Sequence, residues 1–141
     1  MSDLGEITAL VHSYALLLDA GDTEAVAALF AYSTWRSDPA GRILRGTEEI
    51  RPVYEQLKSS EGDTRTKHLL TNLTVDVEPE ASIASAHCYW TVLQNMRPGS
   101  PISILLSGQY TDTFEKVDGA WCFSDRLITV DLTGDTSTHF E

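Results

Sequence analysis

Apolar residues recur every three or four positions in the first part of the chain and at alternate positions in the last part. The first spacing is typical of one face of an amphipathic helix. The residues with this spacing are Ile7, Leu10, Val11, Tyr14, Leu17 and Leu18. Gly21 is placed to end this helix. Asp22 can cap a second helix that runs to about Phe30.

A third helix is predicted after a short strand at 34–37 and a turn at 39–41. Thr47 can cap it, and the acidic side chains of its first turn suit the helix dipole. Its apolar face consists of Ile50, Val53, Tyr54 and Leu57. A polar loop at 59–63 then separates the helical part from the rest of the chain.

Four long segments rich in Thr, Val, Ile, Tyr and Trp follow the helices. They occupy about 67–78, 83–94, 102–116 and 120–132. Their short turns contain Pro, Gly and Asp, which predicts antiparallel hairpins. Helices followed by a meander indicate an α+β fold, with the helices on one face of a curved sheet. We expect one domain at 1–133 and a polar tail at 134–141.

The chain has 141 residues and a net charge of −11, with 10 Lys and Arg against 21 Asp and Glu. This length fits a single hydrophobic core. Because the chain is this acidic, it lacks the basic surface that binding to nucleic acid requires. We therefore expect no nucleic-acid partner. No apolar run approaches the roughly 20 residues that span a bilayer. The first residues lack the pattern of a signal peptide, so we expect a cytoplasmic protein without a membrane partner.

The cysteines and the short motifs indicate no metal or nucleotide chemistry. Cys88 and Cys122 have no metal-binding spacing, and we interpret them as small buried side chains. The common zinc, phosphate-loop and dinucleotide-binding motifs are missing from the sequence. We therefore expect no cofactor and no metal.

His68 and Asp19 are the two residues that we expect to carry chemistry. His68 opens the first long strand, and its side chain is the best candidate for a general base. Asp19 lies in the last turn of the first helix, where the helix dipole favours a cation rather than an acid. It can be a solvated turn residue, or it can hold an imidazole in position.

Strand alternation predicts which faces His68 and a further candidate, Arg126, occupy. It puts Leu69 on one face with Leu73, Val75 and Val77, and His68 on the other face with Leu70, Asn72 and Thr74. In the last strand it puts Arg126 on one face with Cys122, Ser124, Ile128, Val130 and Leu132. A cation among aliphatic neighbours needs a partner, which can be a carboxylate, a cluster of carbonyl groups or an anionic ligand.

The remaining pocket candidates are polar or aromatic side chains on the predicted elements. Trp90 and Tyr14 lie on apolar faces and are also good core residues. Gln109 follows Gly108, which can bulge its strand. The other candidates are Tyr54, Trp35 and Arg36.

At these residues the chain resembles the SnoaL-like, nuclear-transport-factor-2-like superfamily. Within it, the sequence is most similar to the branch of scytalone dehydratase and hexachlorocyclohexane dehydrochlorinase. The resemblance spans about 4–132. It is carried by the segments at 18–22, 68–73, 108–111 and 118–126.

The resemblance implies a cone-shaped α+β barrel with an apolar pocket between three helices and the sheet. It also implies cofactor-free lyase chemistry by a His–Asp pair, matched here by His68 and Asp19. Arg126 matches a pocket arginine of the dehydrochlorinase, and Gln109 stands where scytalone dehydratase has a second catalytic histidine. Leu18 and the segment at 34–38, which contains Arg36, stand in place of its pocket tyrosines.

The leading hypothesis is therefore a dehydratase-like lyase that acts on a small, mostly apolar or polyketide-like molecule. In it, Gln109 or Arg126 stabilises the developing negative charge. An isomerase or a polyketide cyclase can use the same groups. A third hypothesis is a non-catalytic assembly module, like the small subunit of a dioxygenase. The resemblance further implies a homo-oligomer, with a trimer favoured over a dimer.

Overall fold

The computed structural model describes residues 2–58, 62, 64–78, 80, 82–95 and 97–135. Most of the loop predicted at 59–63 and most of the predicted tail therefore lie outside the described residues. Three helices come first, α1 (Asp3–Asp19), α2 (Thr23–Ala28) and α3 (Gly46–Glu55). Two short strands lie between α2 and α3, β1 (Thr34–Asp38) and β2 (Arg42–Arg45). Four long strands complete the chain, β3 (Thr66–Glu78), β4 (Ile83–Gln94), β5 (Ser103–Val117) and β6 (Ala120–Thr133).

The strands form one six-stranded sheet in the order β2-β1-β6-β5-β4-β3. Only β1 and β6 run parallel to one another, and every other pair is antiparallel. The sheet curves but does not close, because β2 and β3 remain at its two edges. The predicted α+β fold with helices on a mostly antiparallel sheet is confirmed. The sheet is an open one rather than a closed barrel.

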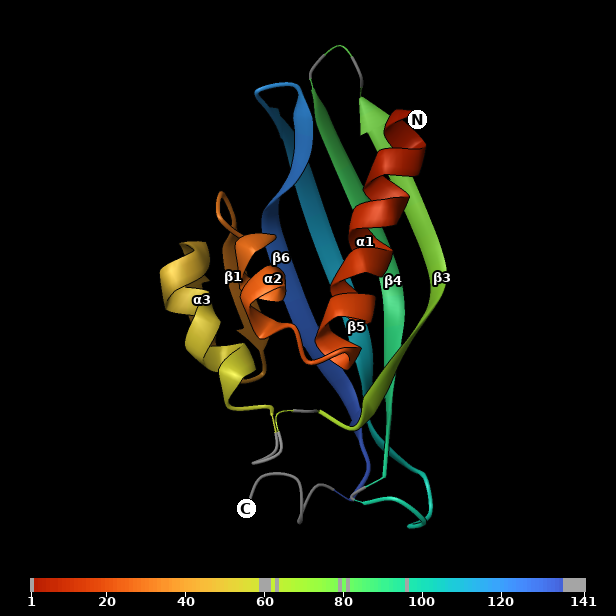
Figure 1. The fold of residues 1–141 in the computed structure, drawn as a ribbon. Coiled ribbons are helices and arrows are strands. Elements are labelled where there is room, and N and C mark those ends of the chain that lie inside the picture. Colours follow the sequence, from red (N-terminus) through yellow and green to blue (C-terminus); the bar gives the residue numbers. More distant parts are fainter. Residues whose placement is uncertain are drawn as a thin grey trace.

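All three helices lie on the same side of the sheet (Figure 1). Helix α1 packs against β3, whereas α2 and α3 pack on one another beside β1 and β2. The buried side of α1 contains Ile7, Val11, Tyr14 and Leu18, which is the predicted apolar stripe. Gly21 ends the helix with a positive φ of 78°. The last turn of α1 thus lies beside the start of β3.

The structure around the third helix differs from the sequence prediction in two respects. Thr47 does not cap α3, because its hydroxyl donates to the carbonyl of Ala27 and the N-cap position belongs to Arg45. Strand β2 was not predicted, since four residues with one half-buried side chain give too short a pattern to recognise. It pairs with β1 through the turn that the sequence did predict at 39–41.

The alternation predicted for β3 is wrong in its first half. A β-bulge lies between Thr71 and Thr74, and Asn72 has a positive φ of 56°. The extra residue shifts the phase of the strand. His68 and Leu70 therefore face the helices together with Leu73, Val75 and Val77, whereas Leu69 faces outward.

Two further bulges change the phase of β6. Its pairing with β5 shifts next to Gly108 and again next to Phe114. Arg126 consequently shares the inner face with Trp121 and Phe123 rather than with Cys122 and Ser124. Leu132 lies outside, with 68% of its surface exposed. The prediction that Ile128 and Val130 share a strand face with Arg126 is correct.

No helix within the described residues has both the length and the apolar character needed to cross a membrane.

Candidate functional site

The structure brings Asp19 and His68 into direct contact where the end of α1 meets the start of β3. Asp19 Oδ1 lies 2.6 Å from His68 Nδ1, and Asp19 Oδ2 accepts a hydrogen bond from the backbone N–H of His68 at 2.7 Å. The second bond fixes the carboxylate against the strand, so the pair is held from both the side chain and the backbone.

The surroundings of Asp19 favour its ionised form. Burial raises the pKa of the Asp19 carboxyl, but the hydrogen bonds and charge of His68 and the hydroxyl of Thr66 together lower it below its ordinary value. An ionised Asp19 accepts the proton on Nδ1 of His68, which leaves Nε2 as the nitrogen with a free lone pair. The described residues supply no hydrogen-bond partner for Nε2 of His68.

Two threonines extend this arrangement along the chain before His68. The hydroxyl of Thr66 donates to Asp19 Oδ1 at 3.0 Å, and it lies 2.9 Å from the hydroxyl of Thr64. Thr64 is buried, and its hydroxyl donates to the carbonyl of Leu18 at 3.3 Å. These hydrogen bonds attach the end of α1 to the residues at the start of β3.

His68 faces a small cavity of about 90 Å³ between the end of α1, the end of α3 and the sheet. Its wall is aliphatic apart from the imidazole of His68 and the side chains of Thr64 and Thr66. The lining residues are Leu18, Leu57, Thr64, Thr66, His68, Val92, Leu105 and Leu106. The cavity can therefore hold a small apolar group beside a potential base.

Aromatic side chains fill the interior beyond His68. The ring of Tyr14 stands edge-on to the ring of His68, with centroids 6.5 Å apart. The Tyr14 hydroxyl lies 2.9 Å from that of Tyr54, which also accepts a hydrogen bond from Trp35 Nε1 at 2.8 Å. Burial raises the pKa of Tyr14 and Tyr54 above the ordinary value, so both stay protonated. These candidates lie in the core and do not line the cavity.

Arg126 is completely buried and pairs with Asp112 on the neighbouring strand. Its Nε and Nη2 donate to the two carboxylate oxygens at 2.7 and 2.8 Å. Burial works against its charge, but Asp112 raises the pKa of Arg126 above the ordinary value. The guanidinium carbon also lies 4.2 Å from the ring centroid of Tyr14 and 3.9 Å from that of Tyr110. Arg126 is therefore part of a buried ion pair and does not line the cavity.

Trp90 lies in the core beside this ion pair. Its ring stacks on Tyr110, with centroids 5.7 Å apart. A Cβ on Gly108 would lie 2.8 Å from the Trp90 ring and 1.8 Å from the carbonyl oxygen of Thr129. Only glycine leaves room for both neighbours at this position.

Gln109 and Arg36 lie away from His68. Gln109 is on the outer face of the sheet, where its amide donates to Asp131 at 2.8 Å and its oxygen lies 2.8 Å from His87 Nε2. Arg36 pairs with Asp125 at 2.7 Å near the surface. The expected role of Gln109 at the cavity is thus not supported by its position.

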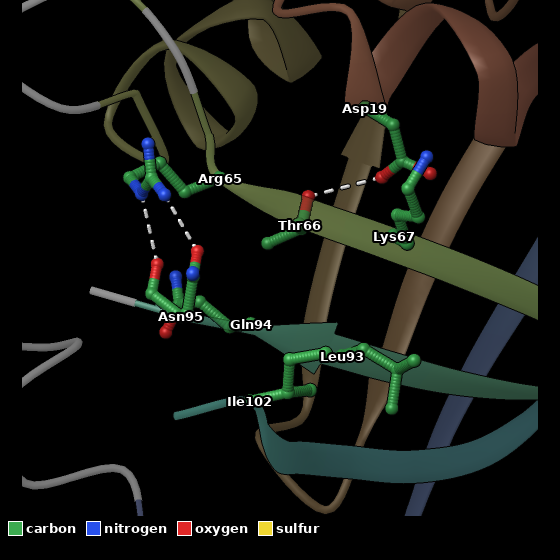
Figure 2. A pocket seen from close by; sticks show the side chains of 8 residues that line it. All are labelled: Asp19, Arg65, Thr66, Lys67, Leu93, Gln94, Asn95 and Ile102. Carbon is green, nitrogen blue, oxygen red and sulfur yellow. Dashed lines mark hydrogen bonds between the residues drawn. The ribbon is translucent and has the colours of Figure 1, made fainter. Parts of the chain in front are cut away.

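A second hollow, an open groove of about 350 Å³, lies beside the start of β3 and the end of β4 (Figure 2). Asp19 and Thr66 appear on one side of it, with Lys67 next to Asp19. On the other side Arg65 donates two hydrogen bonds to Asn95, at 3.0 and 2.6 Å. His68 does not line this groove; its imidazole lines only the smaller cavity.

Metal ligands do not gather at either hollow. In the described part of the chain, no group of three or more His, Cys, Asp or Glu side chains is arranged to hold a metal ion.

The sequence interpretation identified His68, Asp19 and Leu18 but missed most of the cavity wall. Thr66 was detectable, because it precedes His68 by two positions and so shares its strand face. Leu105 and Leu106 were not, since both line the cavity only because a bulge interrupts the β4–β5 pairing beside them.

A comparison with protein families gives one match over most of the chain. A family model described as a SnoaL-like domain matches residues 1–127. No curated protein matches the sequence.

Solved structures with a similar fold are numerous. A protein from Novosphingobium aromaticivorans, named as a candidate scytalone dehydratase, is 27% identical with a TM-score of 0.76, over 94% of this chain and 87% of that one. A candidate dehydratase of the NTF2-like family from Streptomyces avermitilis is 15% identical with a TM-score of 0.74, over 93% and 97%. ActVI-ORFA from Streptomyces coelicolor is 20% identical with a TM-score of 0.75, over 91% and 96%.

Proposed function

Because the chain belongs to the SnoaL-like domain family, we propose that its His68–Asp19 pair catalyses cofactor-independent elimination, as in a dehydratase. The observation that carries this proposal is the 2.6 Å contact between Asp19 Oδ1 and His68 Nδ1 beside an apolar cavity. A similar protein named as a candidate scytalone dehydratase supports the same class of reaction.

The reaction begins when Nε2 of His68 takes a proton from a carbon next to a carbonyl group. The electron pair of that C–H bond forms the new double bond, and the C–O bond at the adjacent carbon breaks. The imidazolium of His68 then returns the proton to the departing hydroxyl, so water leaves and the base is regenerated. Asp19 holds the Nδ1–H tautomer and stabilises the imidazolium between the two proton transfers.

The groups that were expected to stabilise negative charge do not line the cavity. Gln109 faces outward, and Arg126 is bound to Asp112. The charge that develops on the substrate oxygen is instead balanced by the imidazolium of His68, because the hydroxyls of Thr64 and Thr66 already donate to Leu18 and Asp19. General base catalysis of this kind accounts for about 10²–10⁴-fold in rate.

A non-catalytic assembly module predicts a filled interior and a histidine turned away from the aspartate. The interior is indeed largely filled by aromatic side chains and by the Arg126–Asp112 pair. The contact between His68 and Asp19, together with the cavity beside it, favours the catalytic proposal.

Proton abstraction can be tested without knowing the natural substrate. Short ketones and β-hydroxy ketones are incubated with the protein in D₂O, and both deuterium at the α carbon and loss of water are measured. We expect both reactions, and we expect His68→Gln to slow them by about 10²–10⁴-fold. Deuterium uptake without loss of water would indicate an isomerase or a cyclase instead.

His87→Gln is the matched control, because it changes a histidine on the outer face that contacts Gln109 rather than Asp19. This variant should retain full activity. The proposal is wrong if no ketone exchanges its α proton, or if the two glutamine variants behave alike.

A further inference from the structure

The volume at His68 restricts what can react there. Resting on the proposed function, we propose that this cavity is a size filter that admits a short aliphatic reacting group and excludes an aromatic ring. Its volume is about 90 Å³. An aliphatic cavity of about 150 Å³ in another protein is large enough to bind benzene. The volume beside His68 is well below that.

The cavity cannot extend toward the centre of the sheet. Tyr14 stands edge-on to His68 on one side and has the guanidinium of Arg126 over its ring, 4.2 Å away. Tyr110 lies against Tyr14 with ring centroids 5.5 Å apart. Tyr14, Tyr110 and Arg126 are each at most 2% exposed. Closely packed interiors yield little volume without a cost in stability.

The larger groove is not an alternative reaction chamber. It is lined by Asp19 and Thr66 but not by His68, so a ring that lies in the groove does not contact the base. The carboxylate of Asp19 is itself occupied by His68 and Thr66. A substrate must therefore place its reacting carbon within the small cavity.

Leu57 and Leu105 are the residues that we assign to set this size limit. Leu105 lies on β5, is 3% exposed and contributes to the sheet side of the wall. Leu57 follows the end of α3, is half-buried and contributes to the helix side. Because they come from opposite walls, either one can be shortened to enlarge the cavity independently.

The test compares two probes by the NMR shift of the His68 ring signals. One is 2-butanone; the other is 1-indanone, whose reacting carbon belongs to a ring fused to an aromatic ring. We expect the wild type to bind 2-butanone and not 1-indanone. Leu105→Ala and Leu57→Ala should each strengthen binding of 1-indanone by at least about tenfold, the scale of one or two methylene groups in an apolar pocket.

Leu29→Ala is the matched control, because Leu29 is also a half-buried leucine packed on the core but does not line the cavity. Leu29→Ala should bind each of the two probes with the same affinity as the wild type. Should Leu105→Ala fail to fold, the less buried Leu57→Ala still tests the filter. Equal binding of both probes by the wild type, no binding of 2-butanone, or no gain by the enlarged variants would overturn it.

Binding and deuterium exchange separate this inference from the proposed function. If the size pattern holds but no ketone exchanges its α proton, the filter stands and the proposed function fails. If the wild type exchanges the α protons of 1-indanone as fast as those of 2-butanone, the function stands and the filter fails.

Discussion

Asp19 and Asp112 are two carboxylates on the inner side of the protein that differ in burial and in their partners. Asp19 is partly exposed and contacts a histidine that lines a cavity. Asp112 is buried among aromatic rings and binds an arginine with both oxygens. Arg126 was expected to need a partner because of its aliphatic neighbours, and that expectation is confirmed. Its particular partner could not be predicted, since it depends on the register between β5 and β6.

The Asp19–His68 contact should contribute to stability in a pH-dependent way. The pKa of Asp19 is lowered by folding, so its contribution is fully present above the pKa of the unfolded chain, about 3.9. It is lost as the pH falls through the lower pKa of the folded state. Asp19→Asn should therefore be less stable than the wild type at neutral pH, with a difference that shrinks below about pH 4. Urea unfolding at several pH values measures this, and a difference that stays constant would contradict it.

Removing one partner of the Arg126–Asp112 pair should be costly. Arg126→Met leaves the Asp112 carboxylate buried without its cation, and we expect a loss of about 3–5 kcal/mol in the free energy of unfolding. Replacing both, as Arg126→Met with Asp112→Leu, should recover much of that loss, because no uncompensated charge remains. Urea denaturation of the two variants tests this, and equal stability of the single and double variants would refute it.

At the scale of elements, the sequence pattern predicted helices and long strands well but not their faces. Periodicity alone identifies α1 and the four long strands to within a few residues. It fails at the bulges in β3 and β6, because one extra residue reverses every later assignment on a strand. The contact between His68 and Asp19 was inferred from a family resemblance rather than from the strand pattern. Most of the cavity wall depends on bulges and escaped prediction.

Gly108 on β5 has no room for a side chain. A Cβ there would overlap the carbonyl oxygen of Thr129 and press on Trp90. Gly108→Ala should therefore force the β5 and β6 backbones apart, at a cost of about 3 kcal/mol or more. Thr111→Ala, at an exposed position of the same strand, should cost far less. Thermal unfolding of both variants checks this, and similar melting temperatures would contradict it.

At the scale of the whole molecule, the helices cover one face of the sheet and leave the other bare (Figure 1). A row of paired residues crosses this outer face from β3 to β6. It consists of Leu69, Thr91, Ser107 and Leu132. We call this row, with the exposed Tyr89 and Ile104 beside it, the outer patch. The chain carries a net charge of −11, yet the outer patch contains no charged side chain.

We propose that a second copy of this chain covers the outer patch. Two copies repel one another least where neither presents a charge. The patch also carries four exposed hydrophobic side chains, Leu69, Tyr89, Ile104 and Leu132. Light scattering should give a mass above that of one chain, with the trimer expected from the family resemblance. Leu69→Lys should lower the mass to one chain, whereas Leu16→Lys, at an exposed leucine of α1, should not. A monomeric wild type would refute the proposal.

The bulge at Asn72 offers a way to separate folding from the geometry of the histidine–aspartate pair. Deleting Asn72 would restore regular alternation, so that His68, Leu70 and Leu73 would all still face the helices. What disappears is the local bend and added twist that a bulge gives to a strand. An edge strand straightened in this way should keep its apolar contacts while its first residues move away from the end of α1. The protein would then be folded, with the imidazole and the carboxylate both present but no longer in contact.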